Sequence, residues 1–179
     1  MPNLKKNFSD ALEFVNNKVC FVRCDLNLPI VDNKITDFTR LDEIIPTLEK
    51  LISRNGKIIL ISHLGRPKGK VDENLSLEMM IPHIEERLKR SITFCPEQIL
   101  SSETAEKIKK LPPKGVILLE NIRFYKQEEE NDIKFSSKIS EYGDIYINES
   151  FSTCHRSHAS ITGIPSFLPS FPGKLFEQE

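Results

Sequence analysis

Five short runs of largely apolar residues lie along the chain, and each gives way to polar residues. The runs occupy residues 18–23, 57–61, 92–94, 116–119 and 144–148. Their apolar residues are continuous rather than alternating with polar ones, which is typical of strands buried on both faces of a parallel sheet. We therefore predict a parallel sheet at the centre of the fold.

The stretches between these runs carry apolar residues at helical spacing. The clearest helix opens over residues 36–40, and Asn55-Gly56 ends it; its apolar positions are Leu41, Ile44, Ile45, Leu48, Leu51 and Ile52. Further helices are predicted at residues 75–88, which Pro82 kinks or interrupts, at 102–110, and along the stripe Phe135, Ile139 and Tyr142. The alternation predicts one α/β domain, a doubly wound parallel sheet of about five to six strands with helices on both faces in three α/β/α layers.

Polar residues follow four of the predicted strands at the point where each strand ends. They are Asp25 and Asn27, then His63 and Arg66, then Arg123, and finally Arg156; Arg40 stands in the first turn of the helix that follows the first strand. Because parallel strands end at one edge of a sheet, we expect these side chains to meet there. Guanidinium groups suit phosphate and carboxylate, while an Asp and an Asn suit a hydroxyl. A small phosphorylated hydroxy acid fits the whole set.

Simpler interpretations stay open for the individual motifs. The basic loop at residues 62–70 lacks the spacing and the hydroxyl of a nucleotide-binding P-loop, and basic loops are often only solvated. Asp25 and Asn27 would also suit a turn before Pro29, and Arg40 a surface salt bridge. The acidic run at residues 128–132 is interpreted as a solvated helix start without chemistry.

Composition removes several classes of function. Lys and Arg number 25 against 26 Asp and Glu in 179 residues, so no global field favours nucleic acid or membrane as a partner. The four cysteines are too scattered for a disulfide framework and are expected to be reduced and mostly buried, and Cys154, His155 and His158 are too crowded for a zinc site. No signal peptide and no apolar run of membrane-spanning length is found, which predicts a cytoplasmic protein.

Five ordered motifs resemble the N-terminal half of phosphoglycerate kinase. They lie at residues 22–29, 35–40, 62–69, 119–124 and 153–160. The resemblance implies a family with two doubly wound domains joined by a helix, in which the N-terminal domain holds 3-phosphoglycerate and the C-terminal one the magnesium nucleotide. On that basis residues 1–172 would be the substrate-binding domain and 173–179 the start of the interdomain helix. The nucleotide-binding domain would be absent from this chain.

The resemblance also implies a role for each matching residue. Asp25 and Asn27 would hold the substrate's hydroxyl region, the cationic residues after the later strands its phosphate, and Arg40 the phosphoryl group in flight, as the catalytic residue. The complete implied substrate-binding set is Asp25, Leu26, Asn27, Arg40, His63, Leu64, Gly65, Arg66, Arg123 and Arg156. The implied reaction moves a phosphoryl group between ATP and 3-phosphoglycerate and gives ADP and 1,3-bisphosphoglycerate. No bound metal is predicted, and the Mg-ATP or Mg-ADP of the family has no contacts in this chain.

Three residues depart from the family pattern. Ser152 stands where the family usually has glycine, which predicts a strained backbone, Glu149 replaces a shorter acid, and Phe38 replaces a usually polar residue. Because the nucleotide half is absent, we expect the chain to bind substrate with negligible turnover. The full-length family is monomeric, whereas the surface that the second domain would cover could drive self-association. The alternative function is a non-catalytic module that binds another anion or a protein.

Overall fold

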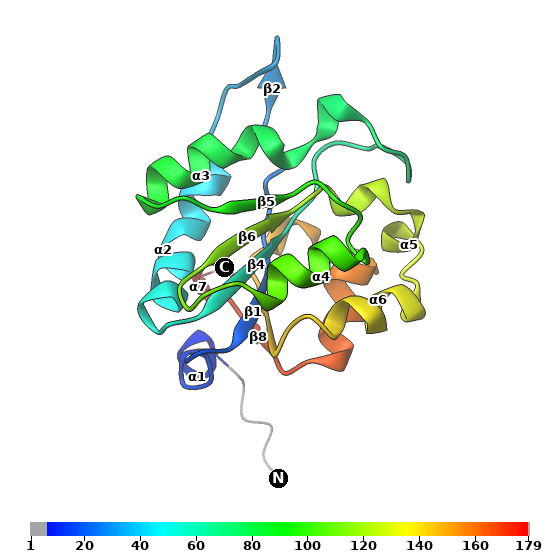
Figure 1. Cartoon of the computed structure of the whole chain (residues 1–179). Coiled ribbons are helices and arrows are strands. Elements are labelled where there is room, and N and C mark those ends of the chain that lie inside the picture. The colour runs from blue at the N-terminus through cyan, green and yellow to red at the C-terminus, as the bar shows by residue number, and fades with distance from the viewer. Residues whose placement is uncertain (1–6, 179) are drawn as a thin grey trace.

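A six-stranded parallel sheet forms the centre of the computed structural model, which describes residues 7–178, the side chains of residues 176 and 178 excepted (Figure 1). Its strands are β1 (Val19–Arg23), β4 (Lys57–Ile61), β5 (Thr93–Cys95), β6 (Val116–Leu119), β7 (Ile145–Asn148) and β8 (Ser170–Pro172), in the order β5-β6-β4-β1-β7-β8. All five strand pairs are parallel. A separate antiparallel pair, β2 (Ile30–Val31) and β3 (Lys34–Ile35), projects from the body.

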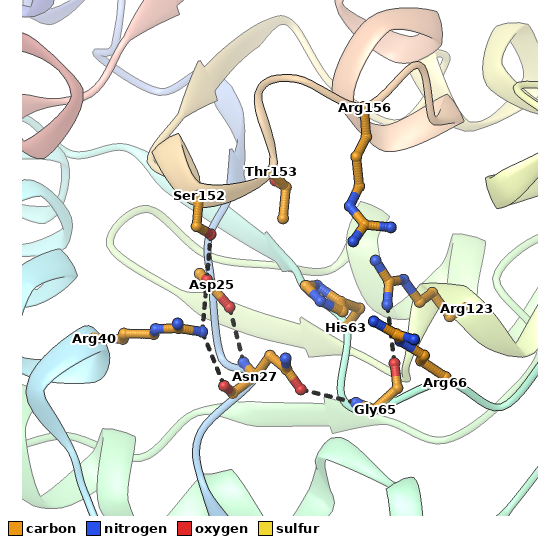
Figure 2. Close-up of a pocket in the computed structure, with 10 residues that line it drawn as sticks. All are labelled: Asp25, Asn27, Arg40, His63, Gly65, Arg66, Arg123, Ser152, Thr153 and Arg156. Atoms are coloured by element: carbon orange, nitrogen blue, oxygen red, sulfur yellow. Dashed lines mark hydrogen bonds and ion pairs between the residues drawn. The ribbon is translucent and has the colours of Figure 1, made fainter.

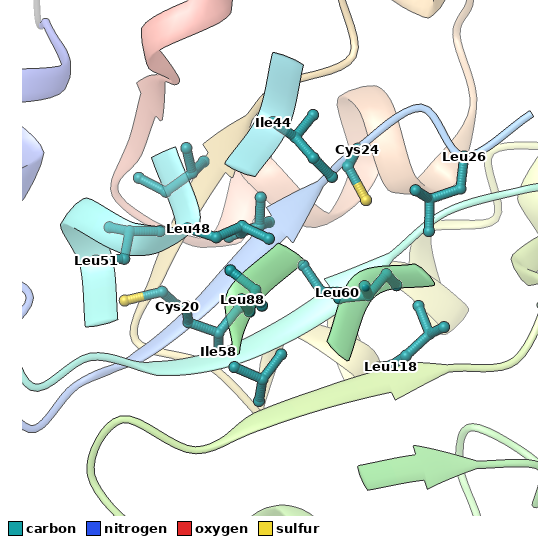
Figure 3. Packing of buried hydrophobic residues seen from close by; sticks show 14 of the residues in the cluster. Cys20, Cys24, Leu26, Ile44, Leu48, Leu51, Ile58, Leu60, Leu88 and Leu118 are labelled. Carbon is teal, nitrogen blue, oxygen red and sulfur yellow. The ribbon is translucent and has the colours of Figure 1, made fainter. Parts of the chain in front are cut away.

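Helices cover both faces of the sheet, which confirms the predicted fold class. Phe21 and Val22 are neighbours in β1 but belong to different apolar clusters, because successive side chains of a strand point to opposite faces. One cluster joins the sheet to α1 (Phe8–Leu12), α2 (Thr39–Ser53) and α3 (Ile81–Leu88), and the other joins it to α4 (Ser102–Lys109) and α6 (Ile133–Ser140). Figure 3 shows Leu48 of α2 and Leu88 of α3 packed with Ile58 of β4.

Helix α2 carries the predicted apolar stripe, and its start places Arg40 in the first turn. Its buried residues include Leu41, Leu48 and Leu51, and it accommodates Pro46 in its interior. The Asp37 carboxylate accepts a hydrogen bond from the backbone N–H of Thr39 at 2.7 Å, at the first residue of the helix. Arg40 therefore lies in the first turn of the helix, as predicted.

Pro82 divides the long helix that was predicted for residues 75–88. Two short 3₁₀ turns, η1 (Glu73–Leu75) and η2 (Leu77–Met80), come first, and α3 then begins at Ile81 with the proline in its first turn. A proline is tolerated there because the backbone N–H groups of a first turn have no partner within the helix. The prediction that this proline interrupts the helix is confirmed.

The acidic run differs from its prediction. It spans the end of a short helix, α5 (Lys126–Glu129), and the residues before α6, and Asp132 caps α6 by accepting the N–H of Phe135 at 2.7 Å. Glu128, however, has no exposed surface, so the interpretation of the run as a solvated helix start is wrong for this residue. A buried carboxylate needs hydrogen-bond donors, and here the backbone N–H and the hydroxyl of Ser160 supply them.

A helix, α7 (Lys174–Gln178), begins after β8, and its role as an interdomain helix stays a prediction. None of the helices within residues 7–178 has both the length and the apolar character that crossing a membrane requires.

Candidate functional site

A polar cavity of about 240 Å³ lies at the carboxyl ends of four adjacent strands, β6, β4, β1 and β7. It is lined by Asp25, Asn27, Arg40, His63, Gly65, Arg66, Arg123, Ser152, Thr153 and Arg156 (Figure 2). The chain leaves β1 toward β4 through α2 on one face and leaves β7 toward β8 on the other side. Ligands of open α/β sheets bind at such a point, where the winding of the sheet reverses.

Eight of the ten residues that sequence reasoning assigned to the site line this cavity, and two do not. Leu26 and Leu64 are buried in the apolar core. Their backbones order the loops: the N–H of Leu26 donates to Ser62 Oγ at 2.9 Å, and the carbonyl of Leu64 accepts from Asn121 Nδ2 at 2.8 Å. Their side chains therefore pack in the apolar core next to the strand ends and do not line the cavity.

One side of the cavity is built around the Asp25 carboxylate. Its Oδ1 accepts the backbone N–H of Asn27 at 3.0 Å, and its Oδ2 accepts Arg40 Nη1 at 3.0 Å. The Ser152 hydroxyl donates to the same Oδ2. Asn27 uses its own Oδ1 to accept the backbone N–H of Gly65 at 2.9 Å, which ties the loops after β1 and β4 together.

Gly65 has a conformational reason to be glycine. Its φ is +62°, in the left-handed region, and a Cβ at this position would stand 2.8 Å from Leu75 Cδ2. Its carbonyl accepts Arg123 Nη1 at 2.9 Å, so the same residue anchors both sides of the cavity. The backbone of the basic loop is thus held at Gly65 by its neighbours, while the side chains of Arg66, Lys68 and Lys70 are exposed.

The other side of the cavity gathers three guanidinium groups. Figure 2 shows Arg66, Arg123 and Arg156 pointing toward one another beside His63. Arg123 is only 4% exposed, its Nε is buried without a hydrogen-bond partner, and burial together with the charge of Arg156 lowers its pKa. Within residues 7–178, none of the three lies within ion-pair distance of a carboxylate. Like charges brought together in this way favour an anionic ligand.

His63 lies under these guanidinium groups and is neutral. Burial and, after it, the charges of Arg23, Arg123 and Arg156 lower the pKa of His63 to about 2. Its Nδ1 is 3.0 Å from Arg23 Nη2, below the cavity. The positive charge on this side of the cavity therefore belongs to arginine alone.

The three departures from the family pattern each have a structural account. Ser152 lies in a 3₁₀ turn, η4 (Phe151–Thr153), and is not among the residues of positive φ, so the expected backbone strain is wrong. Glu149 is buried and accepts from the Thr47 hydroxyl and from the N–H of Leu175 at 3.1 Å. The Phe38 ring packs on His83 and lies under the guanidinium of Arg87.

Between residues 7 and 178, no three His, Cys, Asp or Glu side chains come together as a metal site requires.

Cys154 is exposed on the loop after η4, while Cys20, Cys24 and Cys95 are buried, and all four are free thiols.

Sequence reasoning missed Ser152 and Thr153 as lining residues and Arg23 as a neighbour of His63. Arg23 ends a strand that is otherwise apolar and buried on both faces, and it is itself only 1% exposed. A charged residue in such a strand signals a buried partner, and this signal was present in the sequence.

Comparison with known proteins gives one consistent result. The family model for phosphoglycerate kinase matches residues 10–179. A phosphoglycerate kinase of Orientia tsutsugamushi is 44% identical over 97% of this chain and 42% of its own length, and one of Agrobacterium fabrum is 39% identical over 95% and 42%. The crystal structure of phosphoglycerate kinase from Pyrococcus horikoshii superposes with a TM-score of 0.82 at 32% identity, over 92% of this chain and 42% of that one. The chain therefore spans about two fifths of the length of these relatives.

Proposed function

Because this chain belongs to the phosphoglycerate kinase family, we propose that its polar cavity binds 3-phosphoglycerate, or 1,3-bisphosphoglycerate in the reverse direction. The observation that carries the proposal is the convergence of four arginines and a neutral histidine on one cavity at the strand ends. These five residues come from four separate segments of the chain, so local sequence composition does not explain their meeting.

The distribution of charge around the cavity supports one orientation of the ligand. The cluster of Arg66, Arg123 and Arg156 suits a phosphate group, because guanidinium forks bind phosphate oxygens in pairs. Asp25 and Asn27, between this cluster and Arg40, offer the acceptor and the amide that a hydroxyl needs (Figure 2). Arg40 would then face the carboxylate end of the ligand. The arrangement suits a molecule with an anion at each end and a hydroxyl between them.

The chemistry that this site would support is phosphoryl transfer between ATP and the substrate carboxylate. Such a transfer depends on positioning and on neutralising charge rather than on a protein nucleophile. Arg40 is the residue we assign to the moving phosphoryl group, because Asp25 and the Asn27 carbonyl, 3.1 Å away, hold its guanidinium at the rim while its side chain stays about half exposed.

The magnesium nucleotide is assigned to no residue of this chain. The described residues offer neither a cluster of metal-binding carboxylates nor a glycine-rich phosphate loop of the P-loop kind. A nucleotide-binding unit is therefore the partner that the proposed reaction requires. We expect the chain by itself to bind substrate and to show negligible turnover in a coupled ATP-dependent assay.

Calorimetry with three ligands tests the proposal on the chain as it is. 3-Phosphoglycerate should bind more tightly than glycerate, which lacks the phosphate, and more tightly than inorganic phosphate, which lacks the hydroxy acid. Equal affinity for phosphate and 3-phosphoglycerate would favour a general anion-binding module. Absence of heat with 3-phosphoglycerate at millimolar concentration would overturn the assignment.

A further inference from the structure

Arg23 is a buried neighbour of His63 that does not itself line the cavity. It ends β1 and uses all three of its nitrogen atoms: Nε donates to Ser160 Oγ at 2.9 Å, Nη1 donates to the Cys24 carbonyl, and Nη2 contacts His63 Nδ1 at 3.0 Å. Its side chain is among the largest fully buried ones. A buried guanidinium with every nitrogen directed at a partner is held in one orientation.

The contact between Arg23 and His63 fixes the tautomer of the histidine. A guanidinium has hydrogen-bond donors, no acceptor, and a charge that it keeps at all ordinary pH values. In this contact Arg23 must donate, so His63 Nδ1 must carry a lone pair. A neutral imidazole whose Nδ1 is unprotonated carries its proton on Nε2.

The protonated nitrogen of His63 is the one available to a ligand. The ring lines the cavity, and within the described residues Nε2 makes no hydrogen bond and is not among the buried unpartnered atoms. Adding a second proton would place an N–H of Nδ1 against the N–H of Arg23. The charges of Arg23, Arg123 and Arg156 around the ring oppose that protonation, and His158 opposes it only when it is itself protonated.

Glu128 is linked to Arg23 through Ser160, and its Oε1 also lies 3.8 Å from His158 Nδ1. Ser160 bridges the two: its hydroxyl accepts from Arg23 and donates to Glu128 Oε1 at 2.5 Å, and its backbone N–H donates to Glu128 Oε2 at 2.8 Å. Tyr146 fixes the same residue from below by donating its hydroxyl to the Ser160 carbonyl at 2.6 Å. Hydrogen bonds of this kind offset the cost of burying the two charged groups.

We infer that Arg23 is a positioning residue that holds His63 as the neutral tautomer protonated on Nε2, with Ser160 and Glu128 holding Arg23. His63 then serves the cavity as one neutral hydrogen-bond donor, not as a cation and not as a proton acceptor. The identity of the ligand rests on the proposed function. The tautomer does not, so the experiment is done on the free chain.

Nitrogen NMR of the histidine side chains reads the tautomer directly. In the ¹⁵N-labelled chain we expect His63 Nε2 to give a protonated and Nδ1 an unprotonated signal, with neither moving between about pH 8 and about pH 5, the range in which an ordinary histidine titrates. The spectrum of His63→Gln identifies the two signals. A proton on Nδ1, or a titration midpoint inside this range, would overturn the inference.

Variants then test whether Arg23 is the cause. Arg23→Gln alone removes one charge of the buried network and leaves the Glu128 carboxylate in place. The paired change Arg23→Gln with Glu128→Gln therefore removes both charges together and keeps the network neutral. We expect signals of the Nδ1-protonated tautomer of His63 to appear beside those of the Nε2-protonated one. The ring should stay neutral, because its burial and the charges of Arg123 and Arg156 are unchanged. Arg54→Gln, at an exposed arginine on α2's far end, is the matched control and should leave both signals in place. A single Nε2-protonated tautomer of His63 that persists in the folded double variant would show that Arg23 does not set the tautomer. If the double variant does not fold, the measurement on the unaltered chain decides.

Discussion

Asp25 and Arg40 form an ion pair of 3.0 Å at the rim of the cavity, and the Ser152 hydroxyl shares the same carboxylate oxygen. Oδ2 of Asp25 thus accepts two hydrogen bonds, which is the capacity of one carboxylate oxygen. A ligand hydroxyl that approaches this atom must displace Ser152, because Arg40 is held by charge. Ser152 stands where the family usually has glycine, so this competition is a property of this chain.

Removing the competing hydroxyl should therefore tighten binding. We predict that Ser152→Ala raises the affinity for 3-phosphoglycerate about threefold to tenfold, equivalent to about 0.6–1.4 kcal/mol, the net value of one hydrogen bond. Ser157→Ala, exposed on the same loop, is the matched control and should change nothing. Calorimetry measures both. Weaker binding in Ser152→Ala would mean that this hydroxyl contacts the ligand itself.

His63 should make the fold sensitive to mild acid. The pKa of His63 falls from 6.5 to about 2 on folding, because of burial first and the surrounding arginines second. Between these pH values the unfolded chain binds a proton that the folded chain does not, so stability falls as pH falls below about 6.5. The slope from this one group approaches about 1.4 kcal/mol per pH unit. Urea unfolding at several pH values from about 7 to about 5 should show a shallower dependence in His63→Gln. The same slope in both chains would contradict the prediction.

The burial of Glu128 predicts a measurable loss of stability on neutralisation. Glu128→Gln keeps the shape of the side chain but removes the charge that accepts the hydroxyl and the backbone N–H of Ser160, the residue that links Glu128 to Arg23. We expect the free energy of unfolding to fall by about 2–3 kcal/mol. The neighbouring Glu129 is exposed, and Glu129→Gln should change it by less than about 0.5 kcal/mol. Denaturation curves with equal midpoints for the two variants would refute the role given to Glu128.

The cysteines should differ sharply in reactivity. Burial raises the pKa of Cys20 and Cys24 to about 12 and that of Cys95 to about 11, whereas Cys154 is exposed. Because the thiolate is the reactive form, a chromogenic disulfide reagent should modify one thiol in the folded chain and four after unfolding. Cys154→Ser should abolish the fast reaction. A fast reaction that survives this substitution would place a reactive thiol elsewhere.

The fold could be predicted because its strands are apolar on both faces. Phe21 and Val22 enter opposite cores, so the strand is continuous in hydrophobicity, which is the pattern of a covered parallel sheet. Strand β8 was not predicted, because it is only three residues long and only its middle residue, Phe171, is buried. It forms only because β7 offers it a partner, and such pairing is a tertiary effect.

The cavity could be predicted because its residues follow strands that end at one edge of the sheet. The buried hydrogen-bond network of Arg23, Ser160 and Glu128 could not be predicted. Glu128 meets Ser160 32 positions later in the chain, and no local pattern reports that contact. The acidic run around Glu128 suggested solvent, since charges in a run are exposed more often than buried. Likewise, the hydrogen bond from Ser152 to Asp25 depends on a turn whose geometry the sequence alone does not specify.

The three clustered guanidinium groups of Arg66, Arg123 and Arg156 are the proposed anion site for the phosphate of 3-phosphoglycerate. The most direct measurement is calorimetric titration of this ligand into the unaltered chain, Arg66→Ala and Arg54→Ala. Arg66 lines the cavity and Arg54 is an exposed arginine outside it, so the two variants lose the same charge. We expect Arg66→Ala to weaken binding by about 1.5–3 kcal/mol and Arg54→Ala to leave it unchanged. Equal affinities for the two variants, or no binding to the unaltered chain, would contradict the account.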